Sequence, residues 1–364
     1  MSLKLFSDYK LGNITLKNRV VMAPMTRSRA VNNNAPNDLM VKYYQQRAGA
    51  GLIITEGVSP SPNGLGYPRI PGAFTQEQFD GWKNIAKAVH SEGSAIFMQI
   101  MHTGRVGHDL NLPEQAEVLS PTDVTLSGEM YTDKEGPKSH TKPKRMTKAH
   151  IDEAIEEYVS TAKNIVAAGF DGVEIHAANG YLIEQFINAN VNDRDDEYGG
   201  SIENRSRFLI EVAQKIVAEI GADKVGVRIS PYGVFNDTGN FDGVEETFVY
   251  IAQKMSELGL AYIHVVDHSA MGAPEVPDSI KQKIRNAFEG TYILSGGYDK
   301  QRAEQDLEDG KGDLVAFGRP FISNPDLVER MEKDAPLADP DPDTFYTADE
   351  KGYTDYPFLE EAKA

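Results

Sequence analysis

Short apolar runs recur along the chain and alternate with amphipathic segments. Each run has the length of one buried strand, and strands of a parallel sheet covered on both faces are expected to be continuously apolar. The pattern predicts strands at Val20–Pro24, Leu52–Thr55, Ala95–Ile100, Gly172–Ile175, Val225–Ile229, Tyr262–Val266, Tyr292–Ser295 and Leu314–Phe317.

The segments between these runs have the 3.6-residue period of helices. Thr75 and Gln78 form a capping-box pattern that opens a helix ending near Gly93. Thr147 is the expected N-cap of a helix with apolar residues at i, i+3 and i+4. Further helices are predicted at about Asp38–Ala48, from about Ile202, and at Glu245–Leu258.

Eight strands that mostly alternate with helices favour the α/β class and a single-domain (β/α)8 TIM barrel over residues 1–364. The competing fold is a doubly wound open sheet, which predicts a glycine-rich fingerprint after its first strand. Met25-Thr26-Arg27-Ser28-Arg29 stands there instead, so the barrel is the better prediction.

One polar, proline-containing segment, residues 105–145, interrupts the alternation after the third predicted strand. It is too long for an ordinary connection. We expect an excursion that caps one barrel face, with short strands at Val118-Leu119 and Val124–Leu126. A loose insertion without a role is the alternative.

Composition and charge narrow the classes of function. The formal net charge of −18 argues against nucleic-acid binding, which needs a basic surface. The absence of cysteine excludes disulfides, cysteine nucleophiles and cysteine-ligated zinc or iron–sulfur sites. No signal peptide or membrane-spanning run is visible, and no metal site is predicted. We expect a cytoplasmic protein that acts on small molecules, as a monomer or a homodimer.

The fourth predicted strand leads into three polar residues, His176, Asn179 and Tyr181. His and Asn donate hydrogen bonds to oxygen, and a Tyr hydroxyl is a weak acid. Functional residues of a barrel lie at the C-terminal ends of its strands. The three residues therefore indicate an active site, although a lone histidine there can simply bond a nearby carbonyl.

Two further strand ends predict a phosphate site. Gly296 and Gly297 follow the seventh strand, while Gly318 and Arg319 follow the eighth, where barrel enzymes often bind phosphate. Tight turns alone would also explain the glycines. Arg228 lies within an apolar strand and needs a partner, which can be an anionic ligand or a core carboxylate.

At this point the residues resemble the old yellow enzyme family of flavin-dependent ene-reductases, near the bacterial N-ethylmaleimide and pentaerythritol tetranitrate reductases. The match is nearly end to end. It is carried by Lys17–Arg27, Tyr43–Ala48, Gly172–Leu182, Asp196–Arg205, Ala316–Pro320 and Gly352–Pro357.

The resemblance implies non-covalent FMN across the barrel mouth. Thr26 is similar to the residue that bonds flavin O4, Gln99 to the ligand of the pyrimidine ring, and Arg228 to the cation near N1 and O2. The phosphate would lie at Gly296, Gly297, Gly318 and Arg319. The backbone around the ring would come from Ala23, Pro24, Met25 and Gly57.

The resemblance also implies a reaction. NADPH, or NADH, would reduce the flavin, which then passes hydride to the β-carbon of an unsaturated carbonyl, maleimide or nitroalkene. Nitrate esters and nitroaromatics are further candidate substrates. His176 and Asn179 are similar to the pair that binds the activating oxygen, and Tyr181 to the proton donor. Tyr67 and Tyr346 are similar to aromatic residues of the substrate pocket.

Three positions depart from relatives. Met101 stands where many have Trp, which puts the shape of the substrate pocket in doubt. Thr26 replaces the cysteine of one subgroup, and Asn179 replaces a second histidine of some bacterial members. Two alternatives to an ene-reductase stay open: a phosphate-binding aldolase or isomerase, and a flavin-binding sensor without turnover.

Overall fold

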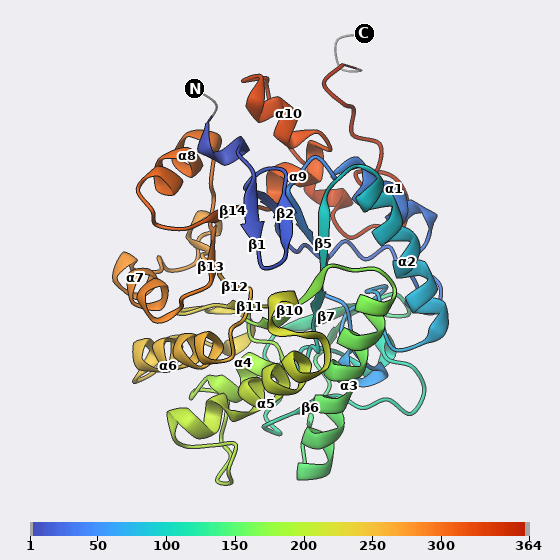
Figure 1. Cartoon of the computed structure of the whole chain (residues 1–364). Coiled ribbons are helices and arrows are strands. Elements are labelled where there is room, and N and C mark those ends of the chain that lie inside the picture. Colours follow the sequence, from blue (N-terminus) through green and yellow to red (C-terminus); the bar gives the residue numbers. More distant parts are fainter. Residues whose placement is uncertain (1–2, 361–364) are drawn as a thin grey trace.

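Eight parallel strands close into a barrel at the centre of the molecule (Figure 1). The computed structural model describes residues 3–360. In order around the barrel, the strands are β3 (Val20–Met22), β4 (Leu52–Ile54), β5 (Ala95–Ile100), β10 (Gly172–Ala177), β11 (Val225–Ile229), β12 (Tyr262–Val265), β13 (Thr291–Ser295) and β14 (Leu314–Phe317).

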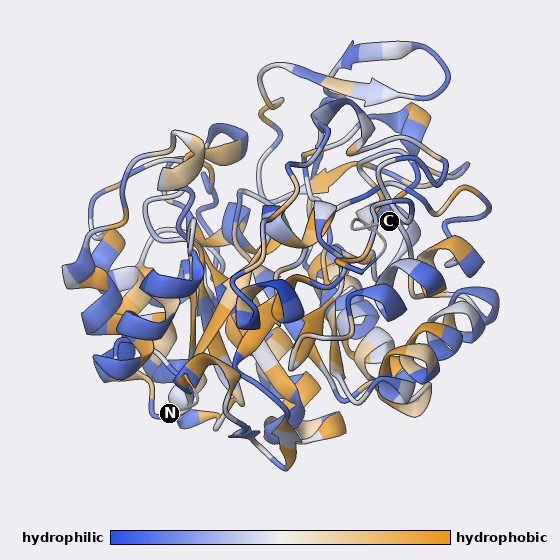
Figure 2. Ribbon diagram, turned by 90° about the horizontal axis from the view of Figure 1, so that it is seen from above, coloured by the Kyte–Doolittle hydropathy of each residue, from blue (hydrophilic) through white to orange (hydrophobic). Residues whose placement is uncertain are grey.

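Helices surround the barrel and cover the apolar outer face of its strands. Figure 2 shows the apolar strands at the centre and polar faces on the surrounding helices. The helices are α1 (Asp38–Gln46), α2 (Gln76–Ser91), α3 (Lys148–Ala167), α4 (Leu182–Ile187), α5 (Ile202–Ile220), α6 (Val244–Glu257), α7 (Asp278–Ala287), α8 (Lys300–Glu308), α9 (Arg319–Ser323) and α10 (Leu327–Glu332).

The predicted barrel is confirmed, including all eight strands. Thr75 and Gln78 form the predicted capping box of α2, and Thr147 caps α3. The fourth barrel strand is longer than predicted, because β10 continues through Ala177. His176 therefore lies within the strand, in register with Arg228 of β11, rather than in the loop that follows.

The excursion after β5 forms two small sheets. Its strands β6 (Leu119–Ser120) and β9 (Lys144–Arg145) pair in parallel, while β7 (Glu129–Thr132) and β8 (Gly136–Ser139) form an antiparallel hairpin. The predicted strand at Val124–Leu126 is wrong. The Val124 amide donates to Thr122 Oγ1 and its carbonyl accepts from Arg105 Nη1, so neither group joins a strand ladder.

Two further segments complete the molecule. A hairpin of β1 (Tyr9–Leu11) and β2 (Ile14–Leu16) precedes the barrel. At the other end of the chain, residues 344–353 pack against α1 and the loop after β3, where buried arginines bond their carbonyls. Within residues 3–360, no helix combines the length and the apolar character needed to cross a membrane.

Candidate active site

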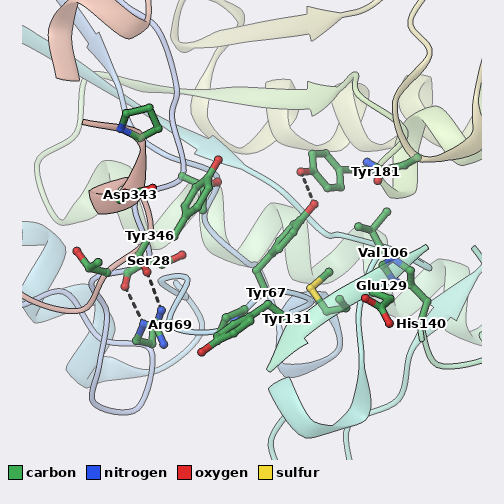
Figure 3. Close-up of a pocket in the computed structure, with 16 residues that line it drawn as sticks. Ser28, Tyr67, Arg69, Val106, Glu129, Tyr131, His140, Tyr181, Asp343 and Tyr346 are labelled. Carbon is green, nitrogen blue, oxygen red and sulfur yellow. Dashed lines mark hydrogen bonds between the residues drawn. The ribbon is translucent and has the colours of Figure 1, made fainter. Parts of the chain in front are cut away.

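A cavity of about 790 Å³ opens above the C-terminal ends of the barrel strands (Figure 3). Its walls come from the loops after β3 and β4, from the excursion, from the turn after β10, and from the segment near the C-terminus. The residues around it include Thr26, Ser28, Tyr67, Arg69, Val106, Glu129, Met130, Tyr131, His140, Tyr181, Asn236, Asp343 and Tyr346.

Tyr181 and Tyr67 meet at the cavity wall. Their hydroxyl oxygens are 3.0 Å apart, within hydrogen-bond distance, and Figure 3 shows the contact. Burial raises the pKa of both phenols, so each keeps its proton at neutral pH. The ring of His176 lies edge-on to Tyr181 at 5.1 Å. A protonated phenol and an imidazole are thus adjacent.

His176 is a neutral hydrogen-bond donor. Burial lowers the pKa of its imidazole well below the ordinary value, and the neighbouring Arg228 guanidinium lowers it further. Its Nδ1 accepts a bond of 3.3 Å from the Ala178 amide. A neutral imidazole has one N–H, so the proton lies on Nε2, which is free to donate to a ligand.

The turn after β10 holds Asn179 in a left-handed conformation, with φ of 61°. The backbone N–H of Asn179 donates to Ser230 Oγ at 2.9 Å, and its backbone carbonyl accepts from Asn236 Nδ2 at 2.7 Å. The next residue must be glycine, because a Cβ on Gly180 would lie 2.6 Å from the carbonyl oxygen of Phe235.

Glu184 fixes the same turn from below. One carboxyl oxygen accepts from the Gly180 amide at 2.6 Å and from Ser230 Oγ at 2.8 Å. The side chain is fully buried, and this burial raises its pKa to about 7. The peptide between Asn179 and Tyr181 is therefore held on a rigid base.

The barrel interior beneath the cavity is polar. Gln99 Nε2 donates to one oxygen of Glu174 at 2.8 Å, and the other oxygen contacts His264 Nδ1 at 2.9 Å. Arg228 lies in register between His176 and His264. Its Nε is buried and has no hydrogen-bond partner among residues 3–360. This unpartnered donor suits an anionic or carbonyl-rich ligand.

The ends of β13 and β14 offer backbone for a phosphate. Gly296 and Gly297 have φ of 124° and 62°, which residues with a side chain rarely adopt. Gly318 directly follows β14, and Arg319 is exposed beside it. The structure thus brings together the predicted phosphate residues on neighbouring strands.

The remaining predicted flavin residues lie around the first strand ends. Ala23, Pro24 and Met25 continue β3, and a Cβ on Gly318 would lie 3.7 Å from Met25 Sδ. Gly57 follows β4, and a Cβ there would lie 2.5 Å from Met101 Sδ. These segments form one rim of the barrel mouth.

The predicted substrate residues differ in position. Tyr67, Tyr181 and Tyr346 border the cavity, and Tyr346 is 61% exposed. Met101 is only 2% exposed and belongs to a small apolar cluster against which Tyr67 and Tyr181 pack. Because it supports both rings rather than lining the cavity, its effect on a substrate would be indirect.

Several residues of the site escaped the sequence analysis. His268 contacts the side-chain oxygen of Asn179 at 3.0 Å, and Ser230, Asn236 and Glu184 hold the same turn. His268 and Ser230 each follow a barrel strand closely. The rule that polar residues after strands form the site could have found these two; Asn236 and Glu184 carry no such signal.

The sequence matches a known family along most of its length. The profile described as the NADH:flavin oxidoreductase / NADH oxidase family matches residues 4–338. The chain is 43% identical to 12-oxophytodienoate reductase 1 of Oryza sativa subsp. japonica, covering 99% of this chain and 94% of that protein. It is 38% identical to 12-oxophytodienoate reductase 2 of Arabidopsis thaliana, covering 99% and 96%.

Solved structures agree. Morphinone reductase superposes with a TM-score of 0.94 at 40% identity, covering 100% of this chain and 98% of that one. Its complex with tetrahydroNAD gives a TM-score of 0.93 at 40% identity, covering 100% and 99%. The resemblance found in the sequence is thereby confirmed: the chain is a flavin-dependent oxidoreductase and belongs to the old yellow enzyme family.

Proposed function

We propose that the protein uses FMN and NADPH or NADH to reduce the activated C=C bond of α,β-unsaturated carbonyls, maleimides and nitroalkenes. Nitrate esters and nitroaromatics are further substrates of the proposed site. One observation carries the proposal. The protonated phenol of Tyr181 borders the cavity. The neutral imidazole of His176 lies against the Tyr181 ring, and the buried Arg228 is in register with His176 on the next strand.

The residues present fit FMN. The unpartnered Arg228 Nε and the left-handed Gly296 and Gly297 suit its pyrimidine ring and its phosphate, and Arg319 can bond the phosphate bidentately. Thr26 and Gln99 would bond the ring edge. We infer that residues 1–364 act as one FMN-binding unit capped by residues 105–145. When bound, the flavin would supply hydride transfer from the nicotinamide to the substrate.

Residues of the chain itself would bind the substrate, polarise its C=C bond and protonate its α-carbon. His176 Nε2–H and the side-chain NH₂ of Asn179 would donate to the activating oxygen of the substrate and draw electron density from its β-carbon. Preorganised donors of this kind are worth about 10²–10³ in rate. Tyr181 would deliver a proton to the α-carbon. Burial raises the pKa of Tyr181, so the phenol stays protonated at neutral pH.

Colour and half-reactions test the proposal. The purified protein should be yellow, bleach anaerobically with NADPH or NADH, and recover its colour when 2-cyclohexenone is added. A colourless protein that takes up no FMN would overturn the proposal and leave an aldolase- or isomerase-type barrel. Bleaching without recovery by enones, maleimides or nitroalkenes would instead indicate a flavin sensor without turnover.

A further inference from the structure

The side chain of Asn179 is contacted by a residue from another strand end. His268 lies three residues after β12, and its Nε2 is 3.0 Å from Asn179 Oδ1. The backbone of Asn179 is already fixed by Ser230 and Asn236. Only the side-chain torsions of Asn179 are left to be set, and the contact with His268 sets the orientation of the amide.

His268 is itself held in place. Its ring lies edge-on to Phe235 at 4.8 Å with an interplanar angle of 82°. Burial lowers the pKa of its imidazole to about 4, and Arg228 contributes in the same direction. His268 is therefore neutral at pH 7, and its single N–H lies on Nε2 when that atom faces a carbonyl oxygen.

The side-chain amide of an asparagine ends in two groups of opposite hydrogen-bonding character. Its oxygen only accepts, its NH₂ only donates, and a half-turn of the last torsion exchanges them. With Oδ1 bonded to His268, the NH₂ is turned away from the imidazole. Without that bond, the amide can rotate and present its oxygen, which repels another oxygen.

We propose that His268 is a positioning residue that selects the donor orientation of Asn179 and so sets the affinity of the site for phenolic and carbonyl oxygens. This inference rests on the proposed function, because the oxygen it concerns is that of the bound substrate. His268 would act on this oxygen through Asn179, the residue that its Nε2 contacts.

The affinity for a phenol tests this role. 4-Hydroxybenzaldehyde is titrated into the FMN-loaded protein, and binding is followed through the flavin absorbance. His268→Leu should weaken binding about five- to tenfold, the value of one lost hydrogen bond. His268→Gln keeps an N–H donor and should stay within about twofold of the wild type. FMN content and melting temperature report on folding.

A double-mutant cycle separates positioning from a general structural effect. In an Asn179→Ala background, His268→Leu should change the phenol affinity by less than twofold. An equal loss in both backgrounds would overturn the inference. If His268→Leu fails to hold FMN, His268→Glu replaces it: this residue matches Gln in size but only accepts, so it must weaken binding where Gln does not.

The two proposals fail in different ways. A wild-type protein that holds FMN but binds no phenol and reduces no enone contradicts the proposed function. A wild-type protein that does both, with His268→Leu and His268→Glu binding phenol as tightly, contradicts only the role of His268.

Discussion

The hydroxyl contact between Tyr67 and Tyr181 decides where the Tyr181 proton points. Two phenols that share one hydrogen bond have one donor and one acceptor. If Tyr67 donates, the Tyr181 O–H is free to turn toward the cavity while its oxygen is held 3.0 Å from Tyr67. Tyr67 would then support the proposed proton donor, Tyr181, rather than donate to the substrate itself.

Replacing each tyrosine by phenylalanine tests this division of roles. Tyr181→Phe should slow enone reduction about 10²-fold, the contribution of one positioned acid, while the nicotinamide still bleaches the flavin at near wild-type rate. Tyr67→Phe should cost less than about tenfold. Stopped-flow measurement of both half-reactions checks this. Equal losses in the two variants would contradict the assignment.

Glu184 makes stability depend on pH. Its pKa is raised from 4.5 to about 7 by burial, so the folded state holds a proton that the unfolded state releases. The free energy of unfolding therefore falls as pH rises from about 4.5 to 7, by about 3 kcal/mol for this one group.

Glu184→Gln should remove that fall, because the amide has no charge to gain. Urea denaturation at pH 5 and pH 8 measures it. The difference in unfolding free energy between pH 5 and pH 8 should be about 2.5 kcal/mol smaller in the variant than in the wild type. It should be unchanged in a control with the exposed Glu332→Gln. The pKa values of Glu56 and Glu157 are also raised to about 7. Their contribution to the pH dependence of stability is the same in the wild type and in both variants, so it cancels in the comparison.

For single residues, the sequence indicated which polar residues follow the strands, and the family resemblance suggested their roles. The sequence did not indicate which other residues hold these side chains in place. Ser230, Asn236 and His268 come from two strand ends and a loop, and they meet Asn179 only because β10, β11 and β12 are neighbours in the closed barrel. Such contacts have no periodic signature along a chain.

The β7–β8 hairpin is the element that borders the cavity from outside the barrel. Arg69 links it to the opposite wall: its Nη1 forms an ion pair with Asp133 at the hairpin tip, and its Nη2 donates to the Tyr346 carbonyl at 2.7 Å. Figure 3 shows Arg69 beside Tyr346 and Ser28. One side chain thus connects two walls of the cavity.

Asp133→Asn should loosen the hairpin while leaving the contact between Arg69 and Tyr346 intact. We expect faster hydrogen exchange in residues 129–139 and a higher KM for bulky enones. Global stability should fall by less than about 1 kcal/mol, as for other partly exposed ion pairs. Lys138→Ala is the matched control, because its ion pair with Glu135 stays within the hairpin. Exchange raised equally by both variants would contradict a link through Arg69.

The elements that could be predicted were those with a buried face. Ala95–Ile100, Val225–Ile229 and Leu314–Phe317 were predicted to the residue, because apolar runs mark strands covered on both sides. The β7–β8 hairpin was missed: half of its residues are exposed, so no continuous apolar run marks its strands. Its pairing depends on the turn at 133–135 rather than on a hydrophobic period.

Across the whole molecule, three buried arginines tie the start of the chain to its end. Arg27, Arg29 and Arg47 are each at most 1% exposed, and all three donate to carbonyls of residues 344–353. The rings of Tyr43 and Tyr353 stack at 4.0 Å within the same cluster. This arginine cluster anchors the segment that carries Tyr346 to the cavity.

Arg47→Met should lower the free energy of unfolding by about 3 kcal/mol or more. It leaves the buried carbonyls of Phe321, Ile322 and Tyr353 without their donor, and hydrogen bonds to charged groups are worth about 1.5–3 kcal/mol each. Urea denaturation measures the loss. Lys42→Met, an exposed substitution on α1, the helix that Arg47 caps, should cost little. Similar losses in the two variants would contradict the anchoring role.

The closed barrel was predictable because eight apolar runs and their helices allow few other arrangements. The arginine cluster was not. Lys17–Arg27, Tyr43–Ala48 and Gly352–Pro357 carried the resemblance as separate motifs. Nothing in their order along the chain shows that Arg27, Arg47 and Tyr353 form one buried contact across more than 300 residues.

The arginine cluster also has a consequence for folding while the chain is being synthesised. The last barrel strand ends at Phe317, so all eight strands are translated before residues 344–353. Until that segment emerges, the guanidinium groups of Arg27 and Arg29 lack most of the carbonyls that compensate their desolvation in the folded protein. Arg47 lacks only the carbonyl of Tyr353. We therefore expect a barrel that lacks this segment to be less stable than the complete fold. The segment that carries Tyr346 to the cavity also supplies these carbonyls, so the cavity wall and this part of the core should be completed together.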